Sequence, residues 1–170
     1  MASSAGWLQW RWWHRALTLS MLTLSLGLAA VSRAPWATAH PPTELRGLGF
    51  PHPAVTAYAG RPAYLVTAIA LLLVAAILAC AVTRRPIEYG SALVLSLFAL
   101  AFSIGVAIER VKWSDAVLNP LLQLPGPGYR AQGSLDLGAI TSLVASGLLV
   151  ALAVFGLVLE RREAAPRSPQ

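Results

Sequence analysis

Four long runs without a charged residue constrain the fold of this chain more than any other feature. They cover residues 16–32, 62–83, 89–108 and 137–159. The shortest has 17 residues and would measure about 26 Å as a helix, near the lower limit for crossing a hydrocarbon core of about 30 Å. None alternates in polarity as membrane strands do. The sequence therefore predicts an all-α, multi-pass membrane protein with a small bundle of four transmembrane helices.

The composition favours lipid over water as the solvent. Hydrophobic residues make up 56% of the chain and charged residues 12%, about half the charged share of a typical soluble domain. The formal net charge is +6, which in a soluble protein would suggest a nucleic-acid partner. Here most arginines flank apolar runs, so we expect the lipid bilayer and its anionic headgroups as the partner, and no nucleic acid. The single cysteine excludes a disulfide framework within the chain.

The linkers predict how the helices are oriented. Residues 84–88 leave room only for a tight turn, so the second and third helices should form an antiparallel hairpin. Arginines in this turn and in the tail at 160–170 favour the cytoplasmic side. These arginines are Arg84, Arg85, Arg161, Arg162 and Arg167. We expect a cell-membrane protein with both termini in the cytoplasm, loops at 33–61 and 109–136 outside, and a disordered tail.

The head at residues 1–15 combines tryptophan with arginine. Its predicted membrane-interface anchors are Trp7, Trp10, Arg11, Trp12, Trp13 and Arg15. Tryptophan favours the headgroup zone and arginine the cytoplasmic side. Stacking on nucleic acid is the alternative, which we disfavour because an apolar run follows directly. Trp36 and Trp113, in the outer linkers, are further predicted anchors.

The segment APWATAHPPTEL, residues 34–45, leaves two interpretations of the first run open. The basic head and the Ala37–Thr38–Ala39 sequence are typical of a signal peptide that is cut after Ala39, which would leave three helices. The apolar run is longer than the 7–15 residues of a signal-peptide core, which favours a retained helix.

Cleavage after Ala39 would open a metal-binding alternative. His40 would become the N-terminus, and its amine and imidazole together suit Cu(II). His52 and Glu44 are the candidate partners. The competing interpretation is that these are ordinary loop residues held extended by adjacent prolines, and no metal or cofactor is our primary expectation.

Small residues recur at every fourth position in the third and fourth runs. They are Ala99, Ser103 and Ala107, then Gly138, Ser142 and Ser146. This spacing places each set on one helix face, where backbones approach closely and hydroxyls bond across the contact. The two faces predict either a docking surface for another protein or internal packing of the bundle.

The second outer linker contains WSDAVLNPLLQL, residues 113–124. Its apolar residues fall near one face, which predicts a short helix on the outer membrane surface, bent near Pro120. A lid over a lipid-facing groove is the alternative function of this segment.

The sequence contains no motif of enzymatic chemistry. GxxxxGK[ST], HExxH, GxSxG and CxxC are all missing. Glu109, Asp115 and Asp136 lie among basic and aromatic residues, where interfacial pairing accounts for them. The apolar runs carry no ionisable group of the kind that proton relays and carriers of charged substrates require. We therefore expect no catalytic residues.

The segment LAAVSRAPWATA and the outer loop after it resemble a family of small actinobacterial membrane proteins, the tryptophan-operon-associated membrane proteins of unassigned biochemical function. The matching residues are Arg33, Pro35, Trp36, Arg84, Arg85, Arg161 and Arg162. The resemblance implies a bacterial four-helix membrane protein and no catalytic residues.

The expected function is a non-catalytic accessory or assembly subunit that packs against a larger membrane protein or itself. One alternative is an oligomeric transporter or lipid-handling protein for neutral or apolar molecules. The other is an outer-face metal or redox site at His40 and His52.

Overall fold

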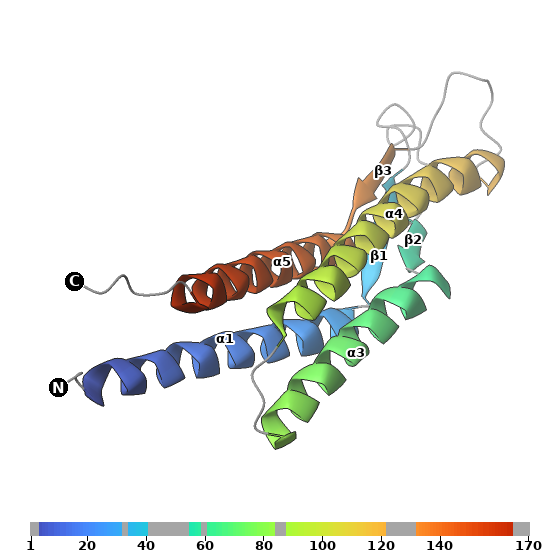
Figure 1. The fold of residues 1–170 in the computed structure, drawn as a ribbon. Coiled ribbons are helices and arrows are strands. Elements are labelled where there is room, and N and C mark those ends of the chain that lie inside the picture. Colours follow the sequence, from blue (N-terminus) through green and yellow to red (C-terminus); the bar gives the residue numbers. More distant parts are fainter. Residues whose placement is uncertain are drawn as a thin grey trace.

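The fold is a bundle of four helices with a small sheet at one end (Figure 1). The computed structural model describes residues 4–31, 34–40, 55–58, 61–83, 88–121 and 132–164. The described elements are α1 (Ser4–Val31), β1 (Pro35–His40), β2 (Val55–Tyr58), α3 (Arg61–Thr83), α4 (Tyr89–Leu121), β3 (Gln132–Leu135) and α5 (Leu137–Ala164). Each predicted apolar run lies in one helix, apart from Ser32 at the end of the first run, which is outside the described residues. A hydrocarbon solvent favours this because every backbone group must bond within its own segment.

Three helices contain stretches that are long and apolar enough to cross a membrane. These stretches are Trp12–Val31 in α1, Tyr89–Lys112 in α4 and Leu137–Arg162 in α5. The fourth helix, α3, contributes a shorter apolar stretch, Tyr64–Cys80. The predicted class, a multi-pass helical membrane protein in contact with the lipid bilayer, is confirmed.

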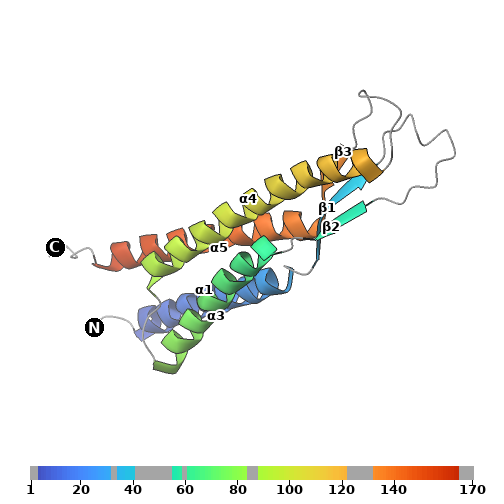
Figure 2. The same cartoon turned by 90° about the vertical axis from the view of Figure 1, so that its right-hand side faces the viewer.

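Each helix contacts two neighbours around the bundle. The contacting pairs are α1–α3, α3–α4, α4–α5 and α5–α1. The start of α1 and the end of α5 lie at one end of the bundle and the sheet lies at the other in both views (Figures 1 and 2). We call these the terminal end, with Trp12–Arg15, Tyr89 and Glu160–Arg162, and the sheet end, with β1, β2 and β3.

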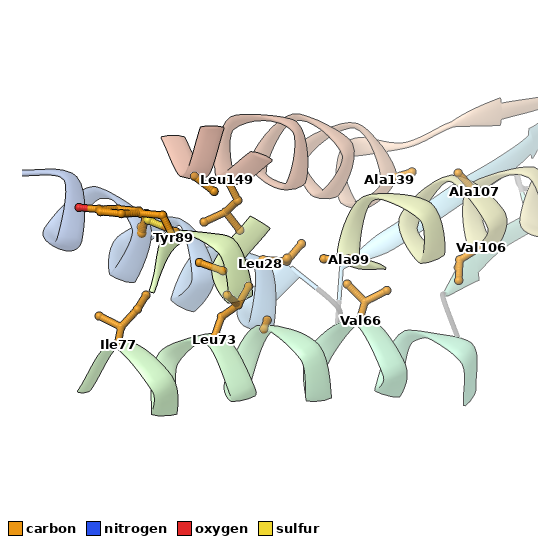
Figure 3. Close-up of a cluster of buried hydrophobic side chains, with 14 of the residues drawn as sticks. Leu28, Val66, Leu73, Ile77, Tyr89, Ala99, Val106, Ala107, Ala139 and Leu149 are labelled. Atoms are coloured by element: carbon orange, nitrogen blue, oxygen red, sulfur yellow. The ribbon is translucent and has the colours of Figure 1, made fainter. Parts of the chain in front are cut away.

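The core is built from residues spaced alternately three and four apart. On α4 the buried residues include Tyr89, Ala92, Ser96, Ala99, Ser103 and Val106, and on α5 Ala139, Ser142, Ser146, Leu149, Ala153 and Gly156. This spacing keeps one stripe of a helix against its neighbours, as in coiled coils. Side chains from all four helices meet in this core (Figure 3). Large apolar side chains such as Leu72, Phe98 and Val144 point outward, as expected where the solvent is lipid.

Three short antiparallel strands occupy linkers that the sequence predicts as loops. The strand order is β2-β1-β3, so β1 is the central strand. Ala37 pairs with Ala57 on one side and with Leu135 on the other. The expectation of an outer loop at 33–61, and of an outer loop with one surface helix at 109–136, did not include these strands. Strands of four to six residues are too short for a clear periodic signal, and their partners lie far apart in the chain.

Helix α4 is longer than its apolar run. It continues without a break to Leu121 and has 33 residues, or about 50 Å, against a hydrocarbon core of about 30 Å. The predicted helix end at Ile108, and the separate surface helix beginning at Trp113, were wrong. Glu109 and Arg110 interrupt the hydropathy but are good helix formers, and α4 packs against all three strands. Its extension thus supports the sheet.

The other two long helices also extend past their apolar runs. The Trp-rich head is not a separate segment, because α1 begins at Ser4. Helix α5 continues to Ala164, so the predicted disordered tail begins with helix. Residues 165–170 lie outside the described part of the chain.

Candidate functional site

Three buried serines meet between α4 and α5. Ser103 Oγ lies 2.9 Å from Ser142 Oγ and 3.4 Å from Ser146 Oγ, and Ser146 Oγ donates to the Ser142 carbonyl at 2.7 Å. All three side chains are fully buried. We call Ser103, Ser142 and Ser146 the serine seam.

One assignment of protons gives every hydroxyl of the serine seam an acceptor. Ser142 donates to Ser103, Ser103 donates to Ser146, and Ser146 donates to the Ser142 carbonyl. If Ser103 instead donated to Ser142, the 3.4 Å contact between Ser103 and Ser146 would have no donor. Each hydroxyl has one proton, and that of Ser146 is already donated to the Ser142 carbonyl. The seam is thus internally satisfied, which is the condition for a polar cluster to be tolerated in an apolar interior.

The two ladders of small residues lie inside the bundle. Ala99, Ser103, Ala107, Gly138, Ser142 and Ser146 are all buried, and the serine seam joins the α4 ladder to the α5 ladder. Of the two interpretations, internal packing matches this placement and the docking surface does not. Small side chains allow close backbone approach here, and the hydroxyls then reach across.

Hydrogen bonds of Asp136 connect the start of α5 to the central strand, β1. Its Oδ2 accepts from Thr38 Oγ1 at 2.6 Å and its Oδ1 accepts from the Leu137 amide at 2.7 Å. The Asp136 amide donates to the Trp36 carbonyl at 3.0 Å. A carboxylate at a helix N-terminus also complements the helix dipole. We expected interfacial pairing for Asp136, although an aspartate just before an apolar run is a recognised signal for a helix start.

Trp36 is a core residue, which corrects its prediction as a membrane-interface anchor. Its side chain is fully buried. A Cβ placed at Gly138 would overlap the Pro35 carbonyl and come within 3.0 Å of Trp36 Cδ1. The missing side chain of Gly138 therefore makes room for β1 to cross the first turn of α5. Trp36 Nε1 has no hydrogen-bond partner among the described residues.

Tyr89 joins three helices at the terminal end. Its hydroxyl lies 2.8 Å from His14 Nδ1, and the two rings stack with centroids 5.8 Å apart. The Tyr89 ring is fully buried and occupies the space that a Cβ on Gly156 would need. Figure 3 shows Tyr89 among the core side chains. The sequence does not predict this contact, because Tyr89 lies 75 residues from His14 and no local spacing connects them.

The predicted anchors at the terminal end are placed on the surface where they are described. Trp12 and Trp13 are exposed and form an edge-to-face pair with centroids 5.5 Å apart. Arg15, Arg161 and Arg162 are also exposed. Trp7, Trp10 and Arg11 lie within α1 and Trp113 lies within α4, but their side chains are outside the described part of the chain, as are Arg84 and Arg85 entirely.

The candidate cleavage segment lies in the sheet. Ala37, Thr38 and Ala39 form the middle of β1 and pair with both neighbouring strands. His40 ends this strand, opposite Gln132. Among the residues that the structure describes, no group of three or more His, Cys, Asp or Glu is placed to hold a metal ion. His52 and Glu44 lie outside that part, so the metal alternative stays a prediction.

The fold and these contacts define the chain as a multi-pass membrane protein whose helical bundle carries a three-stranded sheet at one end. No protein-family model, curated protein or solved structure matches the chain. The resemblance to the tryptophan-operon-associated membrane proteins therefore stays a prediction.

Proposed function

We propose that the protein is a non-catalytic subunit of the cell membrane that packs through the outer face of α1 against a larger integral membrane protein. The observation that carries this proposal is a stripe of small residues on that face. We call Ser20, Thr23, Gly27 and Ala30 the outer stripe, and all four are exposed.

The outer stripe differs from the buried stripe of the same helix. Leu17, Met21, Ser25 and Leu28 fill the core, whereas the outer stripe points away from it. A Cβ built at Gly27 would meet no atom within 4 Å, so the space beside it is open. Leu19 and Leu26 flank the stripe and are exposed. A groove of small residues between larger ones is the surface into which a second membrane helix packs closely.

The hydropathy of α1 also supports the packing of a partner helix against this face. It has the lowest mean hydropathy of the three candidate spans. Ser20 and Thr23 add hydroxyls to a face that would otherwise contact lipid tails, and Thr23 Oγ1 donates to the Leu19 carbonyl at 2.9 Å within its own helix. A partner helix gives such a face dispersion contacts that lipid cannot match at small side chains.

The filled interior argues against transport through a single copy. Met21, Leu28, Leu73, Ile77 and Leu149 are almost completely buried where the four helices meet. The oligomeric transporter or lipid-handling alternative would therefore need a path formed between copies of the chain. We prefer the accessory subunit because the exposed small face is on the outside of the bundle.

The proposal includes the orientation of the chain. Arg15, Arg161 and Arg162 are exposed at the terminal end, and positive charge beside membrane spans favours the cytoplasm. We infer that both termini are cytoplasmic and that the sheet end faces outward.

Photo-crosslinking in intact cells tests the docking face. A photoreactive amino acid at Leu26, beside the outer stripe, should give one protein adduct of defined mass, whereas the same probe at the exposed Val144 on α5 should give lipid adducts only. Adding Gly27→Leu should abolish the Leu26 adduct, because the larger side chain fills the groove.

The matched control is Gly105→Leu on α4, where the space beside the glycine is equally open. It should leave the Leu26 adduct unchanged. Lipid adducts alone at Leu26, or the same protein adduct from Val144, would contradict the proposal. An adduct with twice the mass of the chain would replace the larger partner by a second copy.

A further inference from the structure

We propose that the terminal end binds the headgroups of anionic phospholipids at a site shared by α1 and α5. The site consists of three exposed arginines, Arg15 on α1 with Arg161 and Arg162 on α5, and two exposed tryptophans, Trp12 and Trp13. The proposed docking face, the outer stripe of α1, does not include these residues.

The Tyr89 contact relates the depths of the residues on the two helices. Tyr89 touches His14 on α1 and Gly156 on α5, so those two positions lie at about one level of the bundle. Trp12, Trp13 and Arg15 then lie within about 3 Å of that level along the axis, and Arg161 and Arg162 lie about 8–9 Å beyond Gly156 at 1.5 Å per residue. Helices α1 and α5 are direct neighbours, and both views place the start of α1 and the end of α5 on the same side of the bundle (Figures 1 and 2).

The balance of charge at the terminal end is positive by one. The charged residues described there are four arginines, Arg11, Arg15, Arg161 and Arg162, and three glutamates, Glu88, Glu160 and Glu163. The Glu88 carboxylate accepts a hydrogen bond from Ser91 Oγ at 3.0 Å in the first turn of α4. The planar guanidinium groups offer paired donors that match a phosphate. The surface is therefore complementary to an anion.

The tryptophans identify the source of that anion as a membrane lipid. Trp12 is 64% exposed and Trp13 is 51% exposed, and tryptophan rings concentrate at the level of the headgroups. Both lie at the boundary of a candidate span that runs from Trp12 to Val31. A phosphate held by these arginines beside these rings is thus at the depth where phospholipid headgroups lie.

Lipid titration of the purified full chain tests the proposal. Native mass spectrometry in a neutral detergent should show tighter retention of phosphatidylglycerol than of phosphatidylcholine with the same acyl chains. Each substitution Arg15→Gln, Arg161→Gln and Arg162→Gln should weaken phosphatidylglycerol binding about fivefold, and the triple variant about a hundredfold. The matched control is Lys112→Gln, an exposed cation near the sheet end, which should change binding less than twofold.

Two further readouts distinguish a lipid site from a loss of helix and from a site for free phosphate. Arg161 and Arg162 also stabilise the C-terminal end of α5 through the helix dipole, so their removal could unwind the helix instead of removing a lipid contact. Circular dichroism of the triple variant separates the two effects and should show unchanged helix content. Inorganic phosphate at millimolar concentration should not displace the lipid. Equal retention of the two lipids by the wild type, unchanged binding by the triple variant, or displacement by phosphate would each overturn the proposal.

Discussion

Ser103 on α4 and Ser142 on α5 place their Oγ atoms 2.9 Å apart in the interior of the bundle, although they lie 39 residues apart in the chain. This hydrogen bond fixes the relative positions of the two helices, because sliding one past the other would separate the hydroxyls. A polar contact in an apolar interior specifies register in this way. The bundle thus uses its two small-residue ladders internally, and any partner must bind elsewhere.

Replacing Ser103 by alanine should destabilise the bundle modestly. The change removes the acceptor of Ser142 and the donor to Ser146, so we expect a loss of about 1 kcal/mol in the free energy of unfolding. Unfolding in mixed micelles measures this loss. Ser20→Ala on the outer face of α1 is the control and should change stability by less than about 0.5 kcal/mol. Equal losses for both variants would contradict the assigned role of the serine seam.

Two glycines of α5 should respond oppositely to the same substitution. Gly156→Ala forces a Cβ into the Tyr89 ring, and overpacking of this kind costs about 1–3 kcal/mol. At Gly147 a Cβ meets nothing within 4 Å, so Gly147→Ala should be neutral or stabilise the helix by up to about 1 kcal/mol. Thermal unfolding in detergent compares the two variants. Stability of Gly156→Ala at or above that of Gly147→Ala would show that Tyr89 does not occupy this position.

Removing the carboxylate of Asp136 should loosen the sheet end. Asp136→Ala deletes the acceptor of both Thr38 Oγ1 and the Leu137 amide, and losing a helix cap costs about 0.5–2 kcal/mol. A double-mutant cycle with Thr38→Val isolates the side-chain contact. The two changes should be less costly together than their separate effects summed. Strict additivity would mean that Asp136 and Thr38 act independently.

The mature protein should retain α1. Four residues of this helix complete the core, namely Leu17, Met21, Ser25 and Leu28, and a cut after Ala39 would divide the central strand of the sheet. Intact mass spectrometry of protein purified from membranes should therefore detect a chain that includes α1, of about 18.0 kDa for the sequence given. A chain that begins at His40 would contradict this prediction and would make copper binding by His40 and His52 the next experiment.

The sequence predicted what depends on local patterns and missed what depends on distant pairing. The absence of charge over 89–108 was sufficient to predict a membrane helix, and the fourfold spacing around Ser103 was sufficient to place small residues on one face. The partner of Ser103 was not predictable, since many helix arrangements satisfy the same spacing. The extension of α4 past Glu109 depends on packing against strands that belong to two other linkers.

Trp36 and Tyr89 show the same limit within the candidate site. Tryptophan beside an apolar run is typical of an interface anchor, but Trp36 is buried because Gly138 leaves space for it. Tyr89 likewise depends on Gly156, a residue whose importance lies in a missing side chain. Gly156 does not stand out in a chain with 13 glycines, and the sequence singled out Gly138 only for its fourfold spacing from Ser142 and Ser146.

Labelling from one side of the membrane is the sharpest test of a bundle that spans the bilayer. In a Cys80→Ser background, Ser134→Cys places a thiol on the exposed surface of β3 at the sheet end, and Arg162→Cys places one at the terminal end. A membrane-impermeant maleimide added to intact cells should label Ser134→Cys and should label Arg162→Cys only after permeabilisation. Labelling of both thiols in intact cells, or of Arg162→Cys alone, would contradict a bundle that crosses the membrane with its termini in the cytoplasm.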